Sequence, residues 1–315
     1  IVDWNSGNKI YKSKNTSVKR KWLKFSIITN LSILAVFKYL DFMIRTLGWA
    51  TLKFGNYSTI EEVGIILPVG ISFYTFQTMS YTIDIYREKQ TPAKNFTDFA
   101  CYAAFFPQLV AGPIVRYDEF RSQIDDDLTF KKRNLKVGVT LILYGLVKKM
   151  IFADNFAIHS DSVFGSNESL DNSVLIYWGA LMFGMQIYCD FSAYTDIALG
   201  SAKILGISLP ENFKTPYSST SVQEFWRKWH ISLSTWLRDY LYISLGGNRN
   251  GEIKMYGAIM ITMILGGLWH GASWNFVLWG FLHGILLVIH RPVSYTHLRA
   301  HETEAISYAV FCLKK

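Results

Sequence analysis

Residues 63–83 read VGIILPVGISFYTFQTMSYTI and contain no charged side chain. A helix of this length, rising about 1.5 Å per residue, crosses the roughly 30 Å hydrocarbon core of a bilayer. Further apolar stretches lie on both sides of it, at residues 25–47, 99–115, 135–158, 174–207, 257–270 and 272–290. This grouping predicts an all-α, polytopic integral membrane protein.

The composition favours the same fold class. Half of the 315 residues are hydrophobic and 18% are charged, whereas a typical soluble domain has roughly 25% charged residues. A chain this apolar is not intrinsically disordered, because it has ample surface to bury. Three cysteines in a chain of this length cannot form a disulfide framework.

Residues 9–24 form a basic segment with seven lysines and arginines and no acidic residue. Such a segment binds nucleic acid or lies at a membrane surface. Nucleic-acid binding is disfavoured, because the rest of the chain alternates charge clusters with apolar spans and offers no soluble basic module. The positive-inside rule instead predicts that residues 9–24 face the cytoplasm.

Segment 99–115 contains the helix-breaking residues Pro107, Gly112 and Pro113 and has basic flanks on both sides. If both flanks face the cytoplasm, the segment enters the membrane and returns. Broken backbone at membrane depth is tolerated only where it is buried in protein or lines a cavity. The sequence therefore predicts a buried, re-entrant segment here.

Four charged residues, Lys148, Lys149, Asp190 and Asp196, interrupt two of the apolar stretches. Charges inside a membrane are costly and usually face an interior cavity. For the two lysines, a position at the membrane interface is an equally good interpretation. For the two aspartates, which lie well inside a long apolar run, the pattern favours the cavity.

Two of the seven histidines have unusual neighbours, and the first is His230. It shares a helical face with Trp226, Leu233 and Leu237 by i, i+4, i+7, i+11 spacing, which predicts one helix through this region. Several tryptophans and charges, Arg227 among them, are typical of a helix at the membrane interface. The pattern alone therefore favours His230 as an aromatic-belt residue over a catalytic one.

The second is His270, which lies in the stretch LGGLWHGASWN, residues 265–275. Gly266 and Gly267 allow a backbone or a substrate to approach closely. A neutral imidazole can take a proton from a hydroxyl group near neutral pH. A buried histidine bonded to a helix carbonyl would show the same pattern, so composition leaves the two interpretations balanced.

Other chemistries find no support in the sequence. His283 and His290 are seven residues apart, but no carboxylate or thiolate stands beside them at ligand spacing, and the H-E-x-x-H pattern is absent. The sequence also lacks a G-x-S-x-G nucleophile elbow and a glycine-rich phosphate loop. No metal site and no bound cofactor are expected.

A series of segments resembles the membrane-bound O-acyltransferase (MBOAT) family, and within it the branch of bacterial alginate O-acetyltransferases. The segments are LPVGISFYTFQ (67–77), FFPQLVAGPI (105–114), YCDFSAYTD (188–196), PENF (210–213), WHISLS (229–234) and GLWHG (267–271). In order and spacing the resemblance covers roughly residues 60–291. It implies an MBOAT-like helical bundle around a tunnel, with re-entrant and interfacial helices.

The resemblance also implies site residues. The family's invariant histidine, in a Trp-His-Gly context, corresponds to His270, which would be the general base that deprotonates an acceptor hydroxyl. A second histidine of the bacterial branch, in a Trp-His-x-Ser-Leu-Ser context, corresponds to His230. The candidates for stabilising the oxyanion are His230, Arg227 and the backbone amides around Gly266 and Gly267. Further candidates, for substrate binding, are Arg227, Asp190, Asp196 and Asn275.

The implied reaction is transfer of an acetyl group toward hydroxyls of an exported, alginate-like cell-surface polysaccharide. Acetyl-CoA is the expected donor, because the sequence offers no elbow serine or reactive cysteine that could store an acyl group. Besides the lipid bilayer and the polysaccharide acceptor, a periplasmic or extracellular acyltransferase is the expected partner. The expected location is the bacterial inner (plasma) membrane, crossed several times.

Three alternatives remain open. The same family segments occur in D-alanyl transferases for teichoic acid and in peptidoglycan O-acetyltransferases. A transporter or channel would line its path with Asp190, Asp196, Lys148 and His270 and would yield no acylated product. An inactive, truncated fragment is the third, because members of the family normally have further helices before and after the matched region.

The expected organisation is one partial MBOAT membrane domain over residues 1–292. Residues 293–315 begin VSYTHLRAHETE and resemble a translated sequencing adapter. They are therefore expected to be a non-native tail and are excluded from fold reasoning.

Overall fold

The structure, a computed structural model, describes residues 1–53, 62–109, 112–125, 131–165 and 171–290. In these ranges the chain forms helices joined by turns and extended segments, with no β-strand, which confirms the all-α prediction. The chain divides into two compact units. Unit 1 contains Ile1–Lys214 and His230–Leu233, and unit 2 contains Thr215–Trp229 and the chain from Ser234 onward. The single domain over residues 1–292 stays a prediction, and the predicted tail lies outside the described residues.

The helices of unit 1 include two short π-helical segments, η1 and η2. The elements are α1 (Val2–Lys12), α2 (Thr16–Leu34), η1 (Ala35–Tyr39), α3 (Leu40–Lys53), α4 (Ile71–Tyr86), α5 (Phe96–Ala103), α6 (Phe106–Leu109), α7 (Tyr117–Ile124), α8 (Lys132–Val147), η2 (Lys148–Ala153), α9 (Asp154–Phe164) and α11 (Ser173–Ile204).

Unit 2 is the smaller of the two. Its elements are η3 (Pro216–Ser218), α12 (Val222–Lys228), the π-helical η4 (Leu237–Tyr242), α14 (Glu252–His270) and the helix Trp274–His290. A further helix, α13 (Ile231–Trp236), begins in unit 1 and ends in unit 2.

Three of the described helices are long and apolar enough to cross a membrane. They are Thr16–Lys53, which joins α2, η1 and α3, Ser173–Ile204 (α11) and Glu252–His270 (α14), while Trp274–His290 is apolar but shorter. In the most apolar windows of the first two, only 11% of the residues are buried. An apolar surface of this extent is typical of helices that lipid covers.

The charge-free stretch 63–83 is not one helix, so that prediction is wrong. α4 begins only at Ile71, and the residues from Glu62 to Val69 are not helical. Pro68 lacks an amide proton and disfavours the helical conformation in the residue before it. Gly70, with φ +75°, caps the helix in a left-handed conformation, and a Cβ atom there would collide with the carbonyl oxygen of Leu109.

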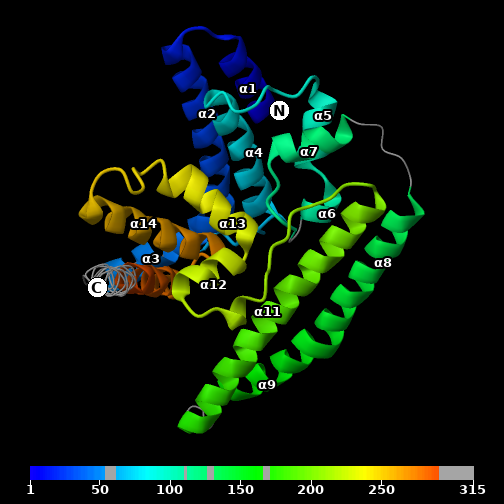
Figure 1. Ribbon diagram of the computed structural model, residues 1–315. Helices are drawn as coiled ribbons and strands as arrows, with labels where there is room; N and C mark the ends of the chain where they lie inside the picture. Colours follow the sequence, from blue (N-terminus) through cyan, green and yellow to red (C-terminus); the bar gives the residue numbers. More distant parts are fainter. Residues whose placement is uncertain (54–61, 110–111, 126–130, 166–170, 291–315) are drawn as a thin grey trace, which may run out of the picture. The chain divides into compact units, whose positions relative to one another are not determined.

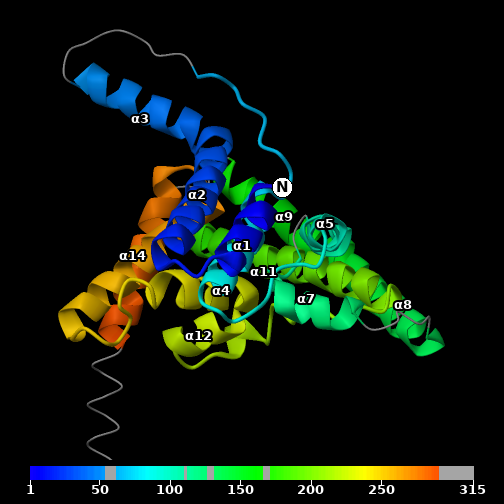
Figure 2. The same cartoon turned by 90° about the horizontal axis from the view of Figure 1, so that it is seen from above.

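The helices α1, α2 and α4 pack together (Figure 2) around a buried polar network. Ser26 donates a hydrogen bond to Asp3 at 2.6 Å and lies 2.9 Å from the hydroxyl of Thr82. Asn30 donates to the same carboxylate at 2.7 Å. The network ties the basic N-terminal helices to α4, since a buried carboxylate is tolerated only where such partners satisfy it.

α8, η2 and α9 form one continuous helical rod that runs alongside α11 (Figure 1). Two glycines set how closely the rod approaches α11. A Cβ atom on Gly145 would lie 2.7 Å from the carbonyl oxygen of Ala193, and one on Gly200 would lie 2.5 Å from that of Gly138. Small residues at a helix contact allow this separation in membranes, where close packing is a main source of helix association.

In its described residues, 99–109 and 112–115, segment 99–115 is broken, as predicted; it is buried in part, at Tyr102 and Gln108 for example, whereas Phe106 is exposed. The chain forms α5, then the four-residue α6, and then a non-helical segment that includes Pro113 to Val115. The carbonyl of Tyr102 accepts hydrogen bonds from the side chains of Gln77 at 2.9 Å and Gln108 at 3.0 Å, and the Tyr102 hydroxyl donates to the carbonyl of Val115. These bonds replace the helical ones that the break removes. The re-entry into the membrane stays a prediction.

An aromatic core fills unit 1 between α4, α5 and α7. Tyr81 lies 4.8 Å from Phe99 and 5.1 Å from Tyr117 between ring centroids, and Phe105 lies 5.1 Å from Phe120. Edge-on and tilted pairs of this kind add stability beyond the buried area.

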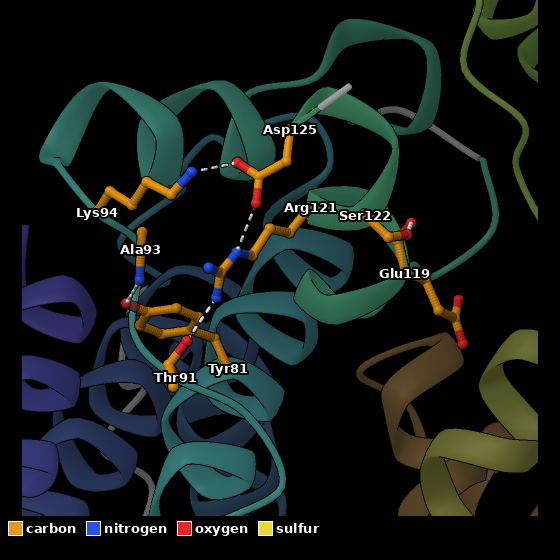
Figure 3. Close-up of polar contacts among 8 residues, drawn as sticks. All are labelled: Tyr81, Thr91, Ala93, Lys94, Glu119, Arg121, Ser122 and Asp125. Carbon is orange, nitrogen blue, oxygen red and sulfur yellow. Dashed lines mark hydrogen bonds and ion pairs between the residues drawn. The ribbon is translucent and has the colours of Figure 1, made fainter. Parts of the chain in front are cut away.

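A polar cluster closes this core at the end of α7 (Figure 3). Asp125 binds Lys94 at 2.8 Å and Arg121 at 3.1 Å, and Arg121 also donates to the hydroxyl of Thr91. The bonds from Lys94 and Arg121 hold the pKa of Asp125 below its ordinary value of 3.8.

The lowered pKa predicts how the stability contribution of Asp125 depends on pH. Because the folded-state pKa lies below the unfolded one, the contribution is complete above pH 3.8 and disappears as the pH falls through the folded-state value. In detergent, the melting temperature of the wild type should exceed that of Asp125→Asn slightly at pH 7, and the difference should shrink as the pH is lowered below 3.8. A difference that grows on acidification would contradict the assignment.

Candidate active site

The helix predicted through His230 is interrupted at that residue. α12 ends at Lys228, Trp229 has an extended backbone, and α13 begins at Ile231. His230 itself has a φ of +41°, in the left-handed region that residues other than glycine seldom adopt. The predicted single helix with one shared apolar face is therefore wrong.

Asn212 supplies the physical reason for the interruption. Its backbone carbonyl accepts a hydrogen bond from the amide of Ile231 at 2.9 Å, and its side-chain Oδ1 accepts one from the amide of Ser232 at 3.1 Å. The hydroxyl of Ser232 in turn accepts the amide of Ile114 at 2.9 Å. Asn212 is buried, so these bonds form away from water and hold the chain in its turn at His230.

The His230 ring is buried within unit 1, with 1% of the residue exposed. It lies edge-on to Phe191 of α11, at 4.6 Å between centroids, and 6.3 Å from Phe73 of α4. Phe191 also packs against Phe213, at 5.1 Å. The interpretation of His230 as an interfacial aromatic-belt residue is therefore wrong, because its surroundings within the protein exclude it from the surface.

His270 is the last residue of α14 and belongs to unit 2. Its partly exposed ring lies edge-on to Trp279 at 5.2 Å and 6.4 Å from Phe276. The helix Trp274–His290 comes so close to α14 that a Cβ atom on Gly267 would collide with the carbonyl oxygen of Phe276. The close approach predicted at this glycine is confirmed, and a backbone segment makes it.

A third histidine, His283, joins His270 in a cluster that sequence reasoning did not single out. Its ring lies 4.5 Å from Trp279 and 5.2 Å from Trp226. Among the described residues, the buried Nδ1 of His283 and Nε1 of Trp226 have no hydrogen-bond partner. The spacing Trp279 to His283 was the available signal, because residues i and i+4 of a helix share a face.

The four charges inside the apolar stretches pair between η2 and α11 of unit 1. Lys148 binds Asp196 at 2.6 Å, and Lys149 binds Asp190 at 2.7 Å. Both lysines lie in η2, and π-helical segments often occur at functional sites. Mutual pairing lowers the cost of placing such charges inside a membrane.

Lys148 and Asp196 also line a cavity of about 340 Å³ in unit 1. Its walls come from α8, η2, α11 and the segment 208–213. The position of Asp196 agrees with the predicted cavity, whereas Asp190 lies outside the lining. A role of either aspartate in substrate binding stays a prediction.

The Lys148–Asp196 pair predicts a strong dependence of stability on its charge balance. Both side chains are less than one-fifth exposed, so Lys148→Met leaves a buried carboxylate without its cation and should destabilise the protein by about 3 kcal/mol. The double variant Lys148→Met/Asp196→Leu should recover most of this loss in denaturation measured in detergent. Lys214→Met is the control, because the Lys214–Glu211 pair is about two-thirds exposed and should change stability little. A double variant no more stable than Lys148→Met would contradict the pairing argument.

Arg227 and Asn275 are exposed residues of unit 2. Arg227 lies on α12, and Asn275 is the second residue of the helix Trp274–His290. Their roles in substrate binding stay predictions. His230 and His270 belong to different units, so the structure describes the surroundings of each within its own unit.

The fold and these sites define a class of protein. In the part of the chain that the structure describes, no group of three or more His, Cys, Asp or Glu side chains is arranged to hold a metal ion. The main features of the chain are apolar helices of membrane-spanning length and two histidines in aromatic surroundings. The family model of the membrane-bound O-acyltransferases matches residues 11–304, and the chain belongs to this family.

Individual relatives narrow the class further. The chain is 42% identical over 279 residues to the probable alginate O-acetylase AlgI of Pseudomonas syringae pv. tomato, covering 89% of this chain and 53% of AlgI. It is 37% identical to the peptidoglycan O-acetyltransferase of Helicobacter pylori, covering 94% of this chain and 60% of that protein. It is 29% identical to the teichoic acid D-alanyltransferase of Bacillus subtilis, covering 71% and 58%. The chain thus spans little more than half the length of these relatives.

Proposed function

We propose that this chain carries the acyl-transfer centre of a membrane-embedded enzyme that moves an acetyl group toward hydroxyls of an exported, alginate-like cell-surface polysaccharide. The observation that supports this most directly is the setting of His270. A partly exposed imidazole ends a helix of membrane-spanning length, within a wall of aromatic rings. Such a position gives a base both a water-poor environment and access to a substrate.

In the proposed reaction, His270 takes the proton of an acceptor hydroxyl as its oxygen attacks the carbonyl carbon of the acetyl donor. The tetrahedral oxyanion then collapses, the thiolate of the donor leaves, and the imidazolium returns the proton to it. The oxyanion needs a hydrogen-bond donor or a cation. The amides of Gly266 and Gly267 lie inside α14, where helical hydrogen bonds occupy them. We therefore propose a side chain for this role, with His230 and Arg227 as the candidates.

Acetyl-CoA is the proposed donor, used directly or upstream, and a periplasmic or extracellular acyltransferase is the proposed partner that completes delivery. The proposed location is the bacterial inner membrane, with several passes. Acetyl transfer is favoured over D-alanyl transfer, because the two acetyl-transferring relatives are 42% and 37% identical and the D-alanyl transferase is 29% identical. Peptidoglycan is the second candidate acceptor.

The test is complementation with the full-length gene in a bacterial host that lacks surface O-acetylation. O-acetyl groups on the surface polysaccharide should return, and ester-linked D-alanine should not rise. Return of acetyl groups on peptidoglycan alone would favour the second acceptor. A well-expressed protein that restores no ester, or that only carries solute flux in vesicles, would refute the proposal.

A further inference from the structure

Asn212 caps the start of α13 from a remote position in the chain. This helix begins at Ile231, and the first amides of any helix lack partners within it. The side chain directly before a helix, most often Ser, Thr, Asp or Asn, usually supplies such a partner. Here the backbone carbonyl of Asn212 accepts the amide of Ile231 at 2.9 Å, and its Oδ1 accepts the amide of Ser232 at 3.1 Å. Residue 230 therefore does not have to cap the helix, and an imidazole occupies the position.

Phe213, the residue after Asn212, packs against the surroundings of the imidazole. Its ring lies edge-on to Phe191 of α11, at 5.1 Å between centroids and an interplanar angle of 81°. Phe191 in turn lies edge-on to the ring of His230, at 4.6 Å and 88°. Two adjacent residues of the chain thus act on His230. One binds the backbone that follows it, and the other packs against the ring that its side chain contacts.

The backbone conformation of His230 favours a requirement for this particular side chain. Among the described residues, those other than glycine with a positive φ are Glu88, Thr215 and His230. The first two are exposed, whereas His230 is buried. A left-handed conformation costs free energy for a residue with a Cβ atom, and glycine would form the same turn without that cost. Residues held in such conformations cluster at functional sites.

We infer that Asn212 is a positioning residue for acyl transfer: by binding the amides of Ile231 and Ser232, it sets where the imidazole of His230 lies. The inference rests on the proposed function, in which the His230 ring is a candidate for stabilising the oxyanion. Such a donor has to lie within hydrogen-bond distance of the oxyanion, and a displacement of about 1 Å can lower a rate about 10²-fold. Without the Oδ1 acceptor, the start of α13 loses one of its two bonds to Asn212, and the imidazole beside it loses its fixed position.

The first test compares two substitutions of nearly the same size in the full-length protein. Asn212→Leu removes the Oδ1 acceptor and should lower acetyl transfer about tenfold or more. Asn212→Asp keeps an acceptor at the same place and should retain most of the transfer, because Asp and Asn serve equally well as helix caps. The matched control is Asn172→Leu. The side chain of Asn172 accepts the amides of Val174 and Leu175 at the exposed start of α11, so this variant loses a helix cap and should keep wild-type transfer.

The second test separates positioning of the imidazole from support of the fold. In a His230→Gly background no imidazole remains to be positioned, so adding Asn212→Leu should leave the residual acetyl transfer unchanged. Radiolabelled acetate fed to the cells makes this residual transfer measurable. The melting temperature in detergent should fall on adding Asn212→Leu in both backgrounds, because the Ser232 amide loses its acceptor in both. A loss of transfer as large in the His230→Gly background as in the wild type would overturn the inference.

The outcomes also distinguish this inference from the proposed function. A wild-type protein that restores no acetyl ester refutes the proposed function and the inference with it. A wild-type protein that transfers acetyl beside an equally active Asn212→Leu variant overturns the inference alone. Equal losses for Asn212→Leu and Asn212→Asp would also overturn it, because the acceptor at Oδ1 would then not matter. Wild-type transfer by His230→Gly would do so as well, since there would be no ring to position.

Discussion

Replacing His270 with alanine is expected to abolish acyl transfer while the amount of protein in the membrane stays unchanged. In the proposed reaction this imidazole takes the hydroxyl proton, and general base catalysis contributes typically 10²- to 10⁴-fold to a rate. The side chain is partly exposed at the end of α14, where its ring lies near Trp269, Trp279 and Phe276. Because the ring is partly exposed at a helix end, its removal should leave the helix folded.

The informative comparison is between two substitutions and a control, made in the full-length protein. His270→Gln keeps a side chain that can form hydrogen bonds but cannot accept the proton, so it should be as inactive as His270→Ala. His159→Ala removes an exposed histidine of α9 and should retain normal activity. O-acetyl release from the surface polysaccharide, normalised to protein in membranes, measures all three. Normal acetylation by either His270 variant would remove His270 from the mechanism.

The sequence pattern predicted the helical class and the broken segment 99–115 because both depend on local properties. The length of an apolar run decides whether that run can cross a membrane, and a proline or glycine disturbs the helix at its own position. The start of α4 was missed, although Pro68 and Gly70 mark it. The absence of charge over residues 63–83 reports that the stretch is apolar and says nothing about where a helix begins.

The pairing of the intramembrane charges could not be predicted from spacing. Lys148 and Asp196 are 48 residues apart, and their contact depends on how the α8–η2–α9 rod lies along α11. That register is set by close glycine contacts such as Gly200 against Gly138. Sequence analysis identified the charged residues correctly and left open whether the lysines lay at an interface, because only tertiary structure joins the two helices.

The interruption of the helix at His230 also could not be predicted from the helical spacing. The spacing from Trp226 to Leu237 suits a continuous helix, and no proline or glycine interrupts it. The interruption comes from Asn212, eighteen residues away, which binds the amides of Ile231 and Ser232. Bonds to the backbone carbonyl and the side chain of this remote, buried residue override local helix propensity here.

His230 is expected to contribute through its side chain, and comparison of His230→Ala with His230→Gly tests this directly. At φ +41° alanine is strained, whereas glycine adopts the conformation without steric cost, so His230→Gly should be more stable than His230→Ala by about 1 kcal/mol. If the ring helps to stabilise the oxyanion, both variants should lose about 10²- to 10³-fold in acyl transfer despite this difference.

The two measurements, melting temperature in detergent and acetyl transfer by the full-length protein, separate a chemical role from a structural one. His230 is buried against Phe191 and its backbone is held by Asn212, so a purely structural role is the competing explanation for any loss of activity. Under that explanation activity follows stability, and His230→Gly recovers acetyl transfer relative to His230→Ala. Under the proposed role the glycine variant recovers stability alone, because no backbone conformation can replace a ring nitrogen.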